Sequence, residues 1–255
     1  MNYWAFLIVA LALVAYMTIW FGIGFRLKRL DVADTAWGGG FIVAAATSLA
    51  VHSSPRLLLM SALVLIWGLR LASHIWRRNS FKGPDPRYDE LTKKWSKRGF
   101  WLKAYPQIFL VQGFLIYLVA LPITVVGAAP AAKLFVLILI PVAIWVFGFT
   151  FEAVADKQLK AFIVSKKGGV MDSGLWRYSR HPNYFGEVTQ WWALALVALP
   201  VSFGWLGLFG GATITLLILF VSGIPLIEKR YAGNPEYKKY QQLTSAFVPL
   251  PRRSI

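Results

Sequence analysis

Seven stretches of the chain are apolar over close to the roughly 20 residues that a helix needs to cross a bilayer. They cover residues 3–25, 34–51, 56–76, 107–127, 134–154, 184–203 and 205–226. The second stretch and the last two are the weakest, because Gly38–Gly40, Pro200 and Gly204 interrupt them. The pattern predicts an all-α polytopic membrane protein with about seven transmembrane helices, as a single integral membrane domain over residues 1–255.

The composition supports this class. Hydrophobic residues make up 57% of the chain and charged residues only 15%, so a separate soluble domain has no room. The absence of cysteine excludes disulfides and thiolate chemistry. His52, His74 and His181 lie far apart and lack the spacing of metal ligands, so we expect no metal site.

The net charge of +16 is distributed unevenly along the chain. Of 27 Lys and Arg residues, only Arg56 and Lys133 fall in the loops of one side. Most of the others fall in four segments of the opposite side, 26–33, 77–106, 155–183 and 227–255. The positive-inside rule then places the N-terminus outside and the C-terminus in the cytoplasm, and we expect a bacterial inner membrane.

The same charge distribution bears on partners. Nucleic acid is not expected, because no basic–aromatic module or soluble domain is present. The basic loops should instead attract anionic membrane lipids or a polyanionic cofactor. No obligate protein partner is indicated.

A polar stripe marks the third apolar stretch, where Trp67, Arg70 and His74 follow helical spacing. An arginine at this depth normally faces the bundle interior and is a functional candidate. The alternatives are a structural ion pair with Asp34 or snorkelling to the interface. Arg70 is therefore a candidate for catalysis.

The fifth stretch ends with Glu152, Asp156 and Lys160 on one helical face. This arrangement is also typical of an exposed helix end with favourable Glu-to-Lys pairs. Glu152 should still lie near membrane depth, where a carboxylate can accept hydrogen bonds from ribose or amide groups of a cofactor.

The most informative run is residues 174–187, Gly-Leu-Trp-Arg-Tyr-Ser-Arg-His-Pro-Asn-Tyr-Phe-Gly-Glu. Arg177 and Arg180 suit bidentate contact with phosphate. Pro182 is suited to the first turn of a helix. A basic loop beside an anchored helix end would account for the arginines alone.

Other side chains of this run need a different account. Tyr178 and Tyr184 can stack or donate hydrogen bonds beside His181. If Pro182 starts a helix, one face of it carries three polar side chains, Asn183, Glu187 and Gln190. A polar row of this kind in an apolar span points to ligand binding.

Two further segments complete the candidates. Glu228 follows the last span and is followed by Tyr231, Tyr237 and Tyr240, and it can close a cofactor site or pair with a nearby cation. Residues 84–88, Pro-Asp-Pro-Arg-Tyr, predict a rigid turn because of their prolines.

Together these residues resemble the steroid 5-alpha-reductase C-terminal superfamily, particularly its bacterial members. The resemblance covers about residues 145–251, through Glu152/Asp156, the run 174–187 and the Glu228…Tyr240 segment. It implies a seven-span bundle that binds NADPH and reduces a carbon–carbon double bond conjugated to a carbonyl in steroids or other lipids. By position, the resemblance implies that four residues line the cofactor: Asp156, Asn183, Tyr184 and Glu187. It implies that Arg177, Arg180 and Glu228 lie next to them.

Two departures from that pattern matter. Leu226 and Ile227 stand where the animal enzymes carry a His pair. The Glu and Tyr with which those enzymes bind the substrate carbonyl have no assigned counterpart in the N-terminal half of this chain. Isoprenylcysteine carboxyl and phospholipid methyltransferases, which bind S-adenosylmethionine, also carry Arg-His-Pro-x-Tyr-x-Gly before a span. Asn183, the Phe-Gly-Glu at 185–187 and the single Glu228 favour the reductases.

The leading hypothesis is an NADPH-dependent reductase acting on a hydrophobic enone, with residues 1–106 on the substrate side and 107–255 on the cofactor side. Arg70 or Tyr88 would polarise the carbonyl, and Glu187 would orient the nicotinamide amide through Asn183. The alternatives are an S-adenosylmethionine-dependent methyltransferase and a non-enzymatic lipid-binding or transport protein. The predicted cofactor-binding residues are Glu152, Asp156, Arg177, Tyr178, Arg180, His181, Asn183, Tyr184, Glu187, Glu228 and Tyr237.

Overall fold

The computed structural model describes residues 1–80, 85–95, 98–130, 136–165 and 168–253, without the side chains of residues 77–80 and 86. Every regular element in these ranges is a helix, which confirms the all-α class. The chain divides into two compact units, each described here by itself. Unit 1 is Met1–Phe135 with Val197–Phe209, and unit 2 is Val136–Leu196 with Gly210–Ile255.

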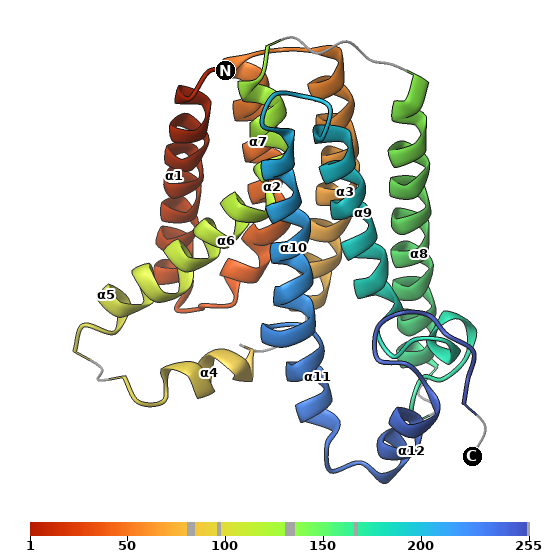
Figure 1. Cartoon of the computed structure of the whole chain (residues 1–255). Helices are drawn as coiled ribbons and strands as arrows, with labels where there is room; N and C mark the ends of the chain where they lie inside the picture. The colour runs from red at the N-terminus through yellow and green to blue at the C-terminus, as the bar shows by residue number, and fades with distance from the viewer. Residues whose placement is uncertain (81–84, 96–97, 131–135, 166–167, 254–255) are drawn as a thin grey trace. The chain divides into compact units, whose positions relative to one another are not determined.

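Unit 1 is built on three long helices, in which α2 packs against both α1 and α3 (Figure 1). Shorter helices and a π-helical turn, Tyr105–Leu110, follow them. The helices are α1 (Trp4–Leu27), α2 (Val32–Val51), α3 (Pro55–Ser80), α4 (Pro86–Thr92), α5 (Phe100–Ala104), α6 (Val111–Val119) and α7 (Leu121–Ala128).

Glycines allow the close packing of α2 on α3. A Cβ at Gly38 would lie 2.9 Å from the carbonyl oxygen of Gly68, and a Cβ at Gly68 would lie 2.9 Å from that of Gly38. Small residues at such crossings let helix backbones approach closely in an apolar environment. The glycines that weaken the second apolar stretch as a span therefore hold it in the bundle.

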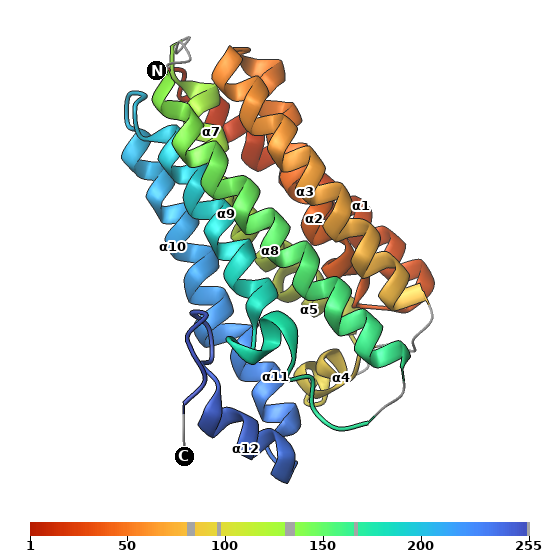
Figure 2. The ribbon, with the colours of Figure 1, turned by 90° about the vertical axis from the view of Figure 1, so that its right-hand side faces the viewer.

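Unit 2 contains helix α8, which has 26 residues and is as long as α3. Helices α8 and α9 lie side by side in this unit (Figure 2). Short 3-10 turns precede α8 and α9, and a π-helical turn, Leu217–Val221, follows α10. The helices are α8 (Leu139–Val164), α9 (Pro182–Ala198), α10 (Leu208–Leu216), α11 (Ile224–Tyr231) and α12 (Pro235–Leu243), with the last residues of α9 and the first of α10 in unit 1.

The contact between α8 and α9 is as close as the one in unit 1. A Cβ at Gly186 would lie 2.5 Å from the carbonyl oxygen of Gly148 and 2.7 Å from the backbone nitrogen of Glu152. Pro182 occupies the first turn of α9, as expected from the sequence. Side chains of α8 and α9 are thereby brought within direct contact distance.

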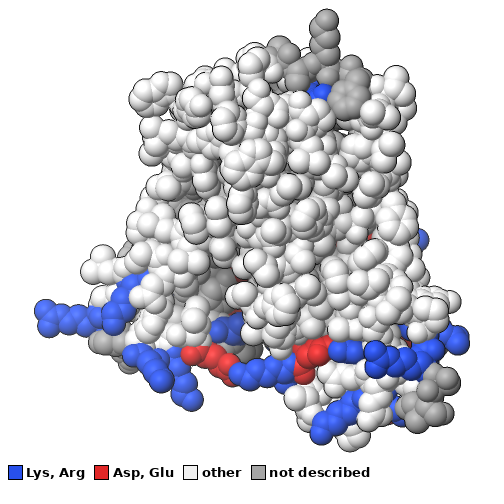
Figure 3. Space-filling model, viewed as in Figure 1, with Lys and Arg blue, Asp and Glu red and all other residues white. Residues whose placement is uncertain are grey.

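Five helical segments in the described ranges are long and apolar enough to cross a membrane. They are Trp4–Leu27, Pro55–Trp76, Phe100–Val119, Val136–Val164 and Gly204–Tyr231. Their flanks expose large apolar side chains such as Leu11, Ile19 and Phe147. On the face drawn in Figure 3, charged side chains gather at helix ends and the flanks carry almost none. These features fit a membrane-embedded protein.

Two of the seven predicted spans fall short of this criterion. Helix α9 has 17 residues, because the chain turns after Ala198, and α2 has its apolar character reduced by Asp34, Thr35 and three consecutive glycines. The predicted span 107–127 is also divided differently, since the helix from Phe100 ends at Val119 and α7 starts at Leu121, next to Pro122.

Two local predictions are wrong. Arg56 lies in the first turn of α3 rather than in a loop, where it is 2% exposed and Nη1 donates to the Val197 carbonyl at 3.1 Å. It thus satisfies a carbonyl at the C-terminal end of α9, which has no partner inside its helix. The segment after Pro84 is not a turn: Asp85 is the N-cap of α4, and its side chain accepts from the Arg87 backbone N–H. Pro84 and Lys133 lie outside the described residues.

The glycine contact in unit 2 generates a prediction. Gly186→Ala should lower the stability of the protein by about 1–3 kcal/mol, because the added methyl meets backbone atoms that cannot move aside. Thermal unfolding in mild detergent measures this. Gly22→Ala in α1 is the matched control, since a Cβ there meets nothing within 4 Å. Equal unfolding temperatures for the two variants would contradict the close crossing.

Candidate functional site

A column of polar side chains joins α8 to α9 in unit 2. Gln190 Nε2 donates to Glu152 Oε2 at 2.7 Å, and Asn183 Nδ2 donates to Asp156 Oδ1 at 3.2 Å. Glu187 lies on α9 between the two levels. Helical spacing on both helices predicts this alignment, since Glu152 and Asp156 are four residues apart.

The part of the column formed by Glu152, Glu187 and Gln190 is buried. Glu152 is 3% exposed, Gln190 1% and Glu187 9%. Burial of polar and charged groups is costly unless they are hydrogen-bonded, so their presence here needs a reason. Gln190 Nε2 also donates to the Gly186 carbonyl at 3.2 Å, whereas its Oε1 has no hydrogen-bond partner among the described residues. The column therefore retains a buried acceptor suited to an N–H donor.

Arg180, in the loop before α9, is held by protein groups. Its Nε and Nη2 donate to Glu228 Oε1 at 2.8 and 2.5 Å. Its Nη1 donates to the carbonyls of Thr244 at 2.6 Å and Gln241 at 3.2 Å. Four of the five N–H groups of a guanidinium are thus engaged. In the structure Arg180 therefore joins the loop before α9 to α11 and to the C-terminal tail.

His181 and Tyr184 lie beside this ion pair. The His181 ring is 2% exposed and stacks on Tyr184 with centroids 5.6 Å apart and planes 15° apart. Its Nε2 lies 3.5 Å from Glu228 Oε1, within ion-pair distance but longer than a hydrogen bond. Glu228 therefore connects both residues of the Arg-His pair to α11, as the sequence suggested it could.

The C-terminal tail completes the site, and most of this was not predicted. Tyr240 Oη donates to the Trp176 carbonyl, and the Arg180 backbone N–H donates to the Ser245 carbonyl at 2.8 Å. Ser179 Oγ donates to the Phe247 carbonyl at 2.7 Å. In the sequence, only the Tyr237…Tyr240 spacing indicated that the tail takes part in the site. The groups that accept these hydrogen bonds are backbone carbonyls, which leave no pattern in the sequence.

The remaining predicted residues are placed differently. Arg177 and Tyr178 have exposed side chains, and neither side chain forms a hydrogen bond or ion pair with a described residue. Tyr237 is 6% exposed, and burial followed by the charge of Glu228 raises its pKa to about 12. Arg177 is therefore a cation of this loop that is available to an anionic ligand.

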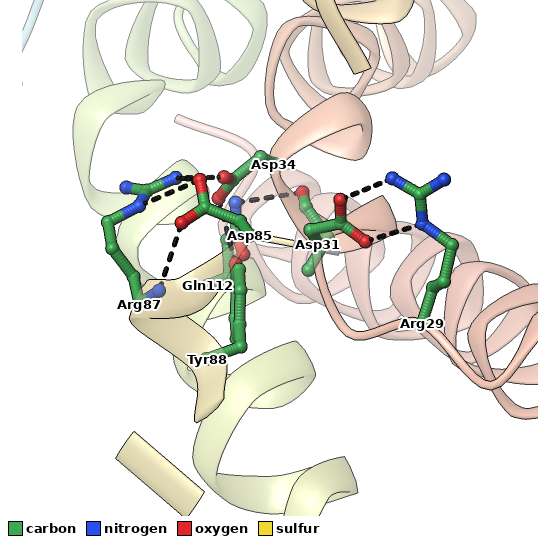
Figure 4. A network of polar contacts seen from close by, with 8 residues as sticks. Arg29, Asp31, Asp34, Asp85, Arg87, Tyr88 and Gln112 are labelled. Atoms are coloured by element: carbon green, nitrogen blue, oxygen red, sulfur yellow. Dashed lines mark hydrogen bonds and ion pairs between the residues drawn. The ribbon is translucent and has the colours of Figure 1, made fainter. Parts of the chain in front are cut away.

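In unit 1 a second network surrounds Asp34 (Figure 4). Tyr88 Oη donates to Asp34 Oδ1 at 2.8 Å, and Arg87 Nη2 donates to Asp34 Oδ2 at 2.6 Å and to Asp85 Oδ2 at 2.9 Å. Burial and the neighbouring Asp34 charge raise the pKa of Tyr88, which keeps the phenol neutral. Arg70 lies partly buried on α3, and its expected alternative partner, Asp34, has Tyr88 and Arg87 on its two oxygens.

The two arginines of the loop should respond differently to truncation. Arg180→Ala should cost about 3 kcal/mol, because it leaves the Glu228 carboxylate and two carbonyls without their donor. Arg177→Ala should change stability by less than about 0.5 kcal/mol. Thermal unfolding and limited proteolysis of the tail measure this. Similar losses in both variants would show that the Arg180 contacts do not hold the tail.

Buried phenols should limit stability at alkaline pH. Burial is the main cause that raises the pKa of Tyr237 and Tyr240 in the folded state. Their stabilising effect is complete below the unfolded value near 10 and is lost as the pH rises above it. We expect the unfolding temperature to fall from about pH 10 upward. Tyr237→Phe should flatten this fall, and an unchanged pH profile would contradict the assignment.

Comparisons with known proteins bear on the family. Residues 20–244 match the family described as a protein of unknown function, DUF1295. The match covers most of the chain, so the chain belongs to this family. An uncharacterised protein of Schizosaccharomyces pombe is 26% identical over 229 residues, which span 77% of this chain and 64% of that protein. No solved structure matches the chain.

Proposed function

We propose that this member of the DUF1295 family is a membrane-embedded, NADPH-dependent reductase of the steroid 5-alpha-reductase type. Its substrate would be a hydrophobic enone, a steroid or another lipid. The observation that carries the proposal is the buried polar column of α8 and α9 in the same unit as a loop with an available arginine. Such a unit offers hydrogen-bonding groups in an apolar setting and a phosphate-binding cation beside it.

The donor set of the column fits the nicotinamide end of the cofactor. Gln190 Oε1 is a buried acceptor without a partner among the described residues, and a primary carboxamide supplies the N–H donors that it needs. Asn183 and Asp156 form the second level of the column, at which ribose hydroxyls can be bound. Glu187 would orient the carboxamide together with Asn183.

Charge favours a dinucleotide over S-adenosylmethionine. Residues 155–183 and 227–255 carry twelve Lys and Arg against four Asp and Glu. A field of this sign attracts the phosphates of NADPH, whereas the sulfonium of S-adenosylmethionine is itself a cation. Arg177 would contact phosphate directly, and Arg180 with Glu228 would hold the loop and tail in shape.

Bound NADPH would supply the hydride for reduction of a carbon–carbon double bond conjugated to a carbonyl. The protein's part in polarising that carbonyl would come from Tyr88 or Arg70 in unit 1. The hydrogen bond to Asp34 orients the Tyr88 side chain, and the raised pKa keeps the Tyr88 phenol neutral. Tyr88 would therefore have a proton to donate to the substrate carbonyl once its hydrogen bond to Asp34 is broken. A preorganised donor of this kind contributes about 10²–10³ in rate.

The membrane arrangement is part of the proposal. Helices α2 and α9 would join the five apolar segments as two further spans, which gives seven. The basic segments would then lie in the cytoplasm, with the N-terminus outside and the cofactor site opening inward, in a bacterial inner membrane.

Titration of the purified protein in mild detergent with NADPH and S-adenosylmethionine tests the proposal. We expect saturable NADPH binding, weakened at least tenfold by Asn183→Ala, Glu187→Ala or Arg177→Ala. Gln242→Ala, an exposed residue of α12, is the matched control and should bind as wild type.

The other outcomes have defined meanings. If the protein binds S-adenosylmethionine and does not bind NADPH, the proposal of a reductase is wrong and a methyltransferase is indicated instead. Binding of neither would leave a lipid-binding or transport protein. NADPH binding that is unchanged in folded Asn183→Ala and Glu187→Ala variants would contradict the assigned site.

A further inference from the structure

Unit 1 contains a cavity of about 100 Å³ that adjoins the Asp34 network and has no part in the proposed cofactor site. It lies where α1 ends, between the α1–α2 connection, α4 and α5. Tyr88 forms part of one wall. The lining residues that matter for the argument below are Lys28, Asp85, Asp89, Phe100 and Trp101.

Some of the charged side chains that line this cavity are held in ion pairs, and others are not. Arg29 binds Asp31 through two hydrogen bonds of 2.9 and 2.6 Å, and Asp85 is bound by Arg87. Lys28 and Asp89 are exposed, and neither pairs with the other or with any described residue. The cavity therefore presents one available cation and one available carboxylate at separate positions.

The position of the cavity is that of a membrane interface. Leu27 is the last residue of an apolar span, and Lys28, in the left-handed conformation with φ 53°, ends the helix. Phe25 and Leu27 expose 53% and 59% of their surface. The rings of Trp101 and Phe25 pack with their centroids 5.3 Å apart. The aromatic wall of the cavity therefore continues along α1 onto its apolar surface.

We propose that this cavity binds the headgroup of phosphatidylethanolamine. Asp89 would accept hydrogen bonds from the primary ammonium, with the Trp101 ring contributing cation–π attraction. Lys28 would bind the phosphate, and the acyl chains would lie along Phe25 and Leu27.

Hydrogen bonding restricts the headgroup, because a carboxylate such as Asp89 accepts hydrogen bonds and needs N–H donors beside it. A choline headgroup adds three methyl groups and has no N–H to donate to Asp89. Phosphatidylglycerol has no cation at all. We therefore expect selection of ethanolamine over both.

Lipid binding to the full-length, delipidated protein can be measured by native mass spectrometry with dioleoyl lipids of the three headgroup classes. Phosphatidylethanolamine should bind about tenfold more tightly than phosphatidylcholine or phosphatidylglycerol. Asp89→Asn should abolish this preference, and Lys28→Met should weaken all three lipids. Glu90→Gln and Lys103→Met, exposed neighbours of matched charge, should behave as wild type.

Equal affinity for the three lipids, or a preference retained in Asp89→Asn, would overturn the proposal. Tight binding of soluble glycerophosphoethanolamine would do so too, since it would make the free headgroup and not the lipid the ligand. Both substituted residues are exposed, so the variants should keep the wild-type helical circular dichroism. No nucleotide enters the assay, and its outcome is independent of the proposed reductase activity.

Discussion

The guanidinium of Arg180 joins the loop before α9 to α11 and to the end of α12, which lie about 50 to 60 residues further along the chain. It neutralises Glu228 on α11 and supplies donors to the Gln241 and Thr244 carbonyls. These carbonyls lie at the C-terminal end of α12, where helix geometry leaves them without partners. One planar cation thus satisfies a carboxylate and a helix end that would otherwise be buried at a cost. The loop that carries Arg177 and His181 takes its shape from that arrangement.

The polar column depends on a different constraint, the close approach of two backbones. Because Gly148 and Gly186 have no side chains, α8 and α9 come near enough for Gln190 to reach Glu152 directly. In an apolar environment this pairing is what makes the buried carboxylate tolerable. Unit 1 uses Gly38 and Gly68 in the same way. In each unit, then, small residues set the helix spacing.

Much of this could be predicted from residue spacing alone. Apolar runs predicted the helices, and the i, i+4 spacing of Glu152 and Asp156 predicted that the two carboxylates share one helical face, but the helix that this face meets was not predicted. Side-chain patterns cannot reveal partners that are backbone carbonyls, which is why the roles of Arg180 and Arg56 were missed. The turn predicted at residues 84–88 failed for a related reason: a proline suits the first turn of a helix as well as a turn, and Asp85 selects the helix. Residues that come together only through tertiary packing, such as Tyr88 and Asp34, had no local signal.

The central claim, that unit 2 binds the nucleotide, can be tested most directly by amide hydrogen exchange of the protein with and without saturating NADPH. The account predicts slower exchange in the loop 168–181 and in the tail 235–253, because the cofactor would contact the first and the hydrogen bonds of Ser179 and Arg180 tie the second to it. Unchanged exchange in both segments at saturating NADPH would contradict it.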